Sequence, residues 1–467
     1  MLKLNRDIIF LILKELQNDH KSFYSCLLVN RTWCEMAVPI LWRDPAKIFG
    51  CCLNIKPFKN IFNVILSHLS EESRDYLKIQ GIDVFKEIYQ QPLFNYISFW
   101  KCLDLCFLDY MVALTDIEEN MKYILGKKIL KLFINSDSKF FSLSISELQY
   151  LNILGTEQCF SEIEYFYSDN NANSNILKGL AKINTSIKKL EFYIMYIDDD
   201  DHGIVKLIEV QKSLKEVIFR NSRGTNETYC KLLENSLITY ANSVQYLRID
   251  WKPITEFLSN FVNLVSLDLM DHSYDYFKTW NNLEKASFPF LKFLKSERVP
   301  PWVLANLIKN TKGHLIKINI FNYQDVDDGR LIKAIYQNCP KLNYLRLQLS
   351  NEYVSDFESL LINCQFLFKL DIIGMDNFNW NKLFDILTKF SPINLYKFTF
   401  SAFNYGGLKL ESLKLFLDNW NERHPVLLEI HSGDITIRDL MKKYKTKGVI
   451  KEYVLSSDEW LYIQLDY

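Results

Sequence analysis

The chain has 467 residues, of which 48% are hydrophobic and 24% charged, so it is a folded protein that is too long for one ordinary compact core. Lys and Arg (55) nearly balance Asp and Glu (56), and the net charge of −1 gives no general attraction to nucleic acid or to an anionic membrane. The composition therefore favours several domains or a repeat array, and it argues against nucleic acid and membrane as partners.

The first apolar run and the cysteines bear on the cellular compartment. The run from Ile8 to Leu13 is too short to span a bilayer and lacks a small-residue cleavage site, so we predict neither a membrane segment nor a signal peptide. The ten cysteines are scattered, with only Cys51 and Cys52 adjacent. Such usage is typical of reduced cysteine, and we expect a cytoplasmic or nuclear location.

The N-terminal segment predicts three short helices. Asn5 can cap the first helix, and Asp7 lies in its first turn, where an anion is favoured. "SFYSCLLV" predicts a second helix and "RTWCEMA" a third. Pro39 removes an N–H, so we expect the third helix to break there and Leu41 and Trp42 to fold back. A unit of about 40 residues rarely closes its own core, so its surplus apolar surface needs a partner.

These same residues carry a family resemblance. The order and spacing of Leu4-x-x-Asp7-Ile8-Ile9, Ile12-Leu13-x-x-Leu16, Val29-x-Arg31-x-Trp33 and Leu41-Trp42 resemble the F-box motif. In that family a three-helix F-box binds the small adaptor of SCF-type cullin-RING ubiquitin ligases. The resemblance therefore implies an adaptor protein, and through it a cullin, as partners.

The resemblance spans about residues 1–45, which we predict to be the F-box. Asn5 stands where the family usually has a Pro that often touches the adaptor. The alternative is a plain helical cap for the domain that follows. The adaptor-binding residues implied by the resemblance are Leu4, Ile8, Ile12, Leu16, Trp33, Leu41 and Trp42.

Residues 46–123 show helical periodicity without strand repeats, and we predict a helical linker that caps the following domain. Beyond them, the pattern apolar-x-x-apolar-x-apolar recurs. It begins at Ile129, Leu148, Ile187, Leu214, Val244, Leu264, Leu315, Leu342, Leu367 and Leu395, with weaker copies at Ile163, Leu291 and Leu427.

From Ile187 the copies start about 20 to 32 residues apart, a period typical of leucine-rich repeats. We therefore predict an α/β class, with a curved solenoid of inner parallel strands and outer helices over residues 124–440 and a C-terminal cap over 441–467. Cys339 and Cys364 occupy matching positions and resemble the cysteine-containing repeat subtype that is common in F-box proteins.

The sequence lacks the common motifs for phosphate binding, dinucleotide binding, zinc proteolysis and serine hydrolysis. We expect no enzyme activity, no cofactor and no metal. "DDDDH" (Asp198 to His202) could hold a cation and "KKYKTK" (Lys442 to Lys447) could touch phosphate, but we expect a solvated loop and a solvated surface.

Side chains that flank the middle apolar residue of each repeat strand are expected to face the concave side. They mix both charge signs with tyrosines, and an arc of about a dozen strands suits a protein or long peptide. The candidate substrate-binding residues are Glu191, Tyr246, Arg248, Lys317, Tyr344, Arg346, Lys369 and Asp371. The hypothesis is a substrate-recruiting F-box subunit of an SCF ligase. The alternative is a leucine-rich-repeat scaffold or inhibitor that acts outside the ligase.

Overall fold

The computed structural model describes residues 4–17, 19–49, 55–84, 91–135, 137–145, 157–168, 174–194, 202–221, 226–272, 280–322, 329–375, 377–402, 408–420, 423–431 and 436–456. The chain forms two compact units, Met1–Leu214 and Lys215–Tyr467, and each is treated by itself. The predicted copy at Leu148 and the acidic part of "DDDDH" fall outside the described residues.

The first unit begins with helices and continues into short parallel strands. Its helices are α1 (Arg6–Leu16), α2 (His20–Cys26), α3 (Arg31–Leu41), α4 (Pro45–Phe49), α5 (Ile55–Ser67), α6 (Glu71–Ile79), the 3-10 turn η1 (Tyr96–Phe99), α7 (Leu105–Ala113), α8 (Glu119–Phe133), α9 (Glu157–Phe160), α10 (Ser174–Ile183) and α11 (Gly203–Glu209). Its strands are β1 (Cys102–Asp104), β2 (Ser142–Ile145), β3 (Tyr165–Ser168) and β4 (Lys189–Ile194), paired in chain order.

The three predicted N-terminal helices are confirmed as α1, α2 and α3. Asn5, Asp19 and Asn30 are their N-caps, and each side chain accepts a hydrogen bond from a backbone N–H of the first turn. The predicted break at Pro39 is wrong, because α3 continues through it to Leu41. A proline so near the helix end removes a single hydrogen bond, and the burial of neighbouring side chains offsets that loss.

The second unit alternates strands and helices throughout. Its strands are β5 (Glu216–Asn221), β6 (Tyr246–Ile249), β7 (Ser266–Met270), β8 (Phe293–Glu297), β9 (Lys317–Phe321), β10 (Tyr344–Leu349), β11 (Lys369–Gly374), β12 (Lys397–Ala402), β13 (Val426–His431) and β14 (Ile450–Ser456). Its helices are α12 (Glu227–Leu237), the 3-10 turns η2 (Ile238–Tyr240) and η3 (Phe257–Asn260), α13 (Asn281–Glu284), α14 (Pro301–Lys309), α15 (Arg330–Asn338), α16 (Asp356–Asn363), α17 (Trp380–Phe390), α18 (Leu410–Asn419) and α19 (Ile437–Thr446).

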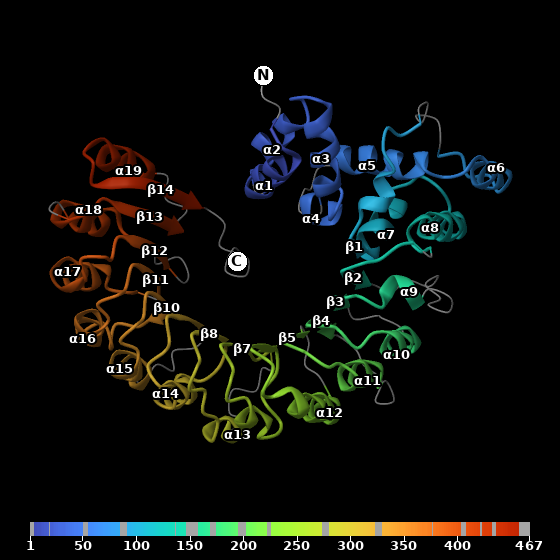
Figure 1. Ribbon diagram of the computed structural model, residues 1–467. Coiled ribbons are helices and arrows are strands. Elements are labelled where there is room, and N and C mark those ends of the chain that lie inside the picture. The colour runs from blue at the N-terminus through green and yellow to red at the C-terminus, as the bar shows by residue number, and fades with distance from the viewer. Residues whose placement is uncertain are drawn as a thin grey trace. The chain divides into compact units, whose positions relative to one another are not determined.

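The second unit is a repeat solenoid, and the predicted α/β class is confirmed. Each strand pairs in parallel with the next one in sequence, and Figure 1 shows the strands along the inner side of the curve with the helices outside. In β10, Leu345, Leu347 and Leu349 are buried while the alternate side chains are part-exposed. The inner strand face therefore presents polar side chains above a leucine core.

Most predicted repeat strands are confirmed, from β3 to β13, but the strand predicted at Ile129 is wrong. Ile129 lies in α8, where Leu125, Ile129 and Phe133 form a buried helical stripe. Three strands were not predicted: β1, which lies in the segment expected to be a helical linker, β2, and β14, which lies in the segment expected to be a cap. Among the described residues, no helix is long and apolar enough to cross a membrane.

Candidate functional site

The N-terminal helices close a small core and leave a second apolar surface uncovered. Ile9, Leu13, Phe23, Cys26 and Ala37 form the buried cluster. Ile8 and Leu11, on the side of α1 turned away from it, are 46% and 60% exposed, and Leu4, which precedes the helix, is 49% exposed. Scattered exposed apolar residues are ordinary, but an aligned set on one face indicates a contact surface. We call Leu4, Ile8 and Leu11 the α1 stripe.

The other predicted adaptor contacts are divided between this surface and the core. Ile12 is half-buried between the two, whereas Leu16, Trp33 and Leu41 pack against the buried cluster. The turn between α2 and α3 adds Leu28 and Val29, which are 88% and 56% exposed. Leu11 and Leu28 were not among the predicted contacts, although the helical spacing from Leu4 to Leu11 could have identified the first of them.

Trp42 joins the three helices to the rest of the first unit. Its ring centroid lies 4.5 Å from that of Tyr96 in η1. The neighbouring Arg43 carbonyl accepts hydrogen bonds from the Lys101 N–H at 2.9 Å and the Cys102 N–H at 3.1 Å, at the start of β1. These contacts fix the end of α3 against the first strand, so Trp42 has an internal structural partner as well as its predicted docking role.

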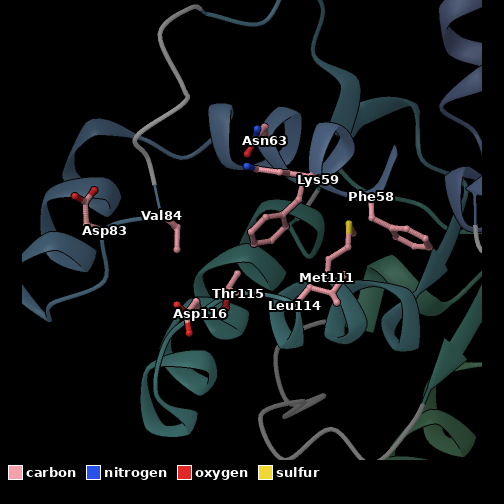
Figure 2. A pocket seen from close by; sticks show the side chains of 10 residues that line it. Phe58, Lys59, Asn63, Asp83, Val84, Met111, Leu114, Thr115 and Asp116 are labelled. Atoms are coloured by element: carbon pink, nitrogen blue, oxygen red, sulfur yellow. The ribbon is translucent and has the colours of Figure 1, made fainter. Parts of the chain in front are cut away.

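A half-open, largely apolar pocket of about 290 Å³ lies among the linker helices (Figure 2). Its lining comes from α5, the segment after α6, and α7 with the turn that follows it. Phe58, Phe62, Met111 and Leu114 supply most of its apolar wall. Among the described residues, its lining includes no His or Cys, and the Thr115 hydroxyl donates to the Val112 carbonyl at 2.6 Å.

Arg248, a predicted substrate contact, is largely buried. Its guanidinium binds Asp250, with Nε 2.8 Å from Oδ1, and lies 3.4 Å from Asp268. Burial alone would lower the pKa of Arg248, but Asp268 and Asp250 raise it above the ordinary value. Burial raises the pKa of Asp268 to about 6 despite the opposing effect of Arg248. This cluster is mainly an internal ion-pair network on β6 and β7.

Tyr344, Lys369 and Asp371 meet on β10 and β11. The Tyr344 hydroxyl donates to Asp371 Oδ2 at 2.7 Å, and Lys369 Nζ lies 3.2 Å from the same oxygen. Lys369 also lies over the Tyr344 ring, 4.8 Å from its centroid. Burial, together with Asp371, raises the pKa of Tyr344, so its hydroxyl remains a neutral donor. Asp371 is only 5% exposed, so it contacts Tyr344 and Lys369 from within the strand surface.

The remaining predicted contacts are spread over β4, β6, β9 and β10, with only Lys317 and Arg346 on neighbouring strands. Tyr246 is on β6, and Lys317 and Arg346 are on β9 and β10 with partly or fully exposed side chains. Glu191 belongs to β4 of the first unit, where it is 8% exposed and accepts a hydrogen bond from the Tyr165 hydroxyl at 3.1 Å. Lys295 on β8 was not among the predicted contacts, although aligning the weak copy at Leu291 with the other repeats places it in the same row as Arg346, with Asn319 between them.

The described residues contain no group of three or more His, Cys, Asp or Glu side chains that could hold a metal ion. Lys442, Lys443, Lys445 and Lys447 are exposed on α19 and the turn after it. Cys339 and Cys364 are fully buried, and burial raises the pKa of the Cys364 thiol to about 12. They pack as small apolar side chains at the ends of α15 and α16.

Solved structures similar to this chain include the following two. The leucine-rich repeat-containing protein LegL7 from Legionella pneumophila is 15% identical with a TM-score of 0.36, and the match covers 56% of this chain and 90% of that one. The complex of Rad7 and Elc1 in yeast gives 12% identity and a TM-score of 0.33, with 88% of this chain and 97% of that one covered. Similarities this weak carry no argument about function. No family model matches the sequence, and the comparison with curated proteins gives no match either.

Proposed function

We propose that this protein is a substrate-recruiting F-box subunit of an SCF cullin-RING ubiquitin ligase. Helices α1 to α3 dock on the ligase adaptor, and the strand face of the repeats holds a protein substrate. The subunit itself performs no covalent chemistry. It acts by raising the effective concentration of the substrate near the ligase's catalytic components.

The α1 stripe is the observation that carries this proposal. A self-contained helical cap would turn its apolar side chains inward, yet here a complete core and an exposed stripe coexist on one short helix. Burying a half-exposed Ile or Leu stabilises a complex by about 1 kcal/mol, so Leu4, Ile8 and Leu11 together supply about 3 kcal/mol. Leu28 and Val29 extend the apolar area that an adaptor could cover.

Asn5, which replaces the Pro usual in the F-box family, is compatible with the proposal. Its side chain accepts a hydrogen bond from the Asp7 N–H, and Arg6 lies 3.4 Å from Glu35 of α3. Asn5 therefore starts the helix by capping it, where a proline would do so by restricting its own backbone angle. The α1 stripe keeps its exposure with Asn5 in place.

The test is calorimetric titration of the full chain with purified SCF adaptor. The variant Ile8→Asp/Leu11→Asp places charges in the stripe without touching the buried cluster, and it should weaken binding by about tenfold or more. Leu16 is less suitable because it packs against the buried cluster, and Ile12 because it is already half-buried.

Phe10→Asp is the matched control. Phe10 is 48% exposed on the same helix, but it projects about 200° around the axis from Ile8. Its variant should bind like the wild type. Failure of the wild type to bind, or equal losses in both variants, would contradict the proposal and favour a repeat protein that acts outside the ligase.

A further inference from the structure

The inner face of the second unit carries a concentrated row of cations. The register places Phe293, Lys317, Tyr344, Lys369 and Lys397 side by side on β8 to β12. Neighbouring strands are about 4.8 Å apart, so these side chains form one continuous row. Lysines and aromatic rings alternate along most of it.

A second row lies two residues further along the same strands. It contains Lys295, Asn319, Arg346 and Asp371 in register. Burial lowers the pKa of Lys295, and the nearby carboxylates of Asp268 and Glu297 oppose that effect. Lys369 of the first row pairs with Asp371. Across the described residues, no carboxylate lies within ion-pair distance of Lys317, Arg346 or Lys397. These three cations therefore keep their charge available for another molecule.

Acidic side chains lie on both sides of this cationic region. On β6 and β7, Asp250 and Asp268 neutralise Arg248. On β13, Glu429 lies 3.4 Å from His431, and hydrogen bonding to that His lowers the pKa of Glu429. The sequence predicted a mixture of positive and negative side chains along the inner face. The strand register separates the two kinds and leaves β8 to β12 with an excess of positive charge.

Two lysines of the first row lie over aromatic rings of the same row. Lys317 Nζ lies 5.7 Å from the Phe293 ring centroid, and Lys369 Nζ lies 4.8 Å from that of Tyr344. Tyr344 is in turn fixed by its hydrogen bond to buried Asp371. Ammonium groups held over aromatic rings lose less side-chain freedom when an anion binds.

We infer that β8 to β12 bind an acidic, extended segment of a protein partner, with Lys317, Arg346 and Lys397 contacting its carboxylates. In an extended peptide, alternate side chains project to the same side about 6.8 Å apart, a spacing that can follow cations arranged over neighbouring strands. This inference rests on the proposed function in one respect, since it names the class of substrate that the ligase subunit would recruit.

The experiment measures fluorescence anisotropy of a labelled peptide of alternating Glu and Ser residues with the full chain. The same peptide with Gln for Glu is the uncharged control. We expect the Glu peptide to bind, the Gln peptide not to bind, and added salt to weaken binding because these charges are exposed. The variant Lys317→Glu/Arg346→Glu/Lys397→Glu should lose about tenfold to a hundredfold in affinity.

The matched control reverses cations on the outer helices. Lys309, Lys333 and Lys414 are exposed on α14, α15 and α18, so Lys309→Glu/Lys333→Glu/Lys414→Glu changes the net charge equally. It should bind the Glu peptide within about twofold of the wild type, since only distant screened charges change. An equal loss in both variants would show attraction by net charge alone and would overturn the inference.

Two further outcomes would also overturn it. One is no binding of the Glu peptide, and the other is tighter binding of a single-stranded RNA of similar length, which would identify a nucleic-acid surface. Adaptor titration of the same triple variants separates the two proposals, because the α1 stripe is unchanged in them. Adaptor binding without peptide binding contradicts only the acidic-segment inference, and peptide binding without adaptor binding contradicts only the ligase proposal.

Discussion

Glu234 offers a sharp test of how one buried charge organises a repeat. It lies on α12 and is fully buried. One carboxylate oxygen accepts from Trp251 Nε1 at 3.0 Å and the Ile254 N–H at 2.8 Å. The other oxygen accepts from the N–H and the hydroxyl of Thr255, both at 2.7 Å. This one side chain thus accepts four hydrogen bonds from the segment after β6.

The substitution Glu234→Gln keeps the size and removes half of the accepting capacity. The amide nitrogen cannot accept, and it fits best on the Thr255 side, where the Thr255 hydroxyl can turn to accept from it and only the Thr255 N–H loses its partner. A buried donor left unpaired costs about 1 to 3 kcal/mol, so the free energy of unfolding should fall by about that amount. Whole domains are typically stable by roughly 5 to 15 kcal/mol, so a loss of this size is measurable.

The assay is urea unfolding followed by circular dichroism, with Glu256→Gln as the control. Glu256 is exposed and pairs with Lys285 at 2.8 Å, and losing a surface pair of this kind costs about 1 kcal/mol or less. Native-state hydrogen exchange should also show faster exchange at the Ile254 and Thr255 N–H groups in the Glu234 variant. Equal stability of the two variants would refute the argument that the carboxylate organises this segment.

Other substitutions test the core and the ion pairs. Asp268 has a raised folded-state pKa of about 6, so the protein should lose stability as pH rises from about 4 to about 6. Asp268→Asn should flatten that part of the pH profile in urea unfolding, and an unchanged slope would contradict the argument. Gly374→Ala would place a methyl group 2.8 Å from two aromatic side chains and should cost about 1 to 3 kcal/mol, measured as a lowered Tm. Cys339 and Cys364 should react with Ellman's reagent only after denaturation, and their rapid modification in the native protein would show that they are not buried.

The repeat strands were predictable because their signal is local. In "LNYLRL" the buried side chains Leu345 and Leu347 alternate with part-exposed ones, and the pattern recurs at each turn of the solenoid. The same spacing gave a wrong strand prediction at Ile129. Residues three and five positions apart also fit a broad helical stripe, and in α8 Ile129 is buried together with Leu125 and Phe133. The length of a segment and its flanking residues distinguish a helix from a strand in such cases, and α8 is longer than a repeat strand.

The candidate surfaces were only partly predictable, because exposure depends on contacts distant in sequence. Arg248 and Arg346 occupy equivalent positions in their repeats, yet Asp250, two residues further on, and Asp268 of the neighbouring strand pair with the first, whereas no carboxylate of the described residues pairs with the second. Ile8 and Leu16 belong to one predicted apolar stripe, but the packing of α2 and α3 leaves Ile8 exposed and partly covers Leu16. Neither difference follows from the spacing of the residues alone.

Hydrogen exchange of the full chain with and without purified SCF adaptor tests the central claim most directly. The account predicts slower exchange in α1 and in the turn that carries Leu28 and Val29, with the strands of the second unit unchanged. Unchanged exchange in α1 at saturating adaptor, or protection confined to the repeat strands, would contradict the assignment of the N-terminal helices as the docking surface.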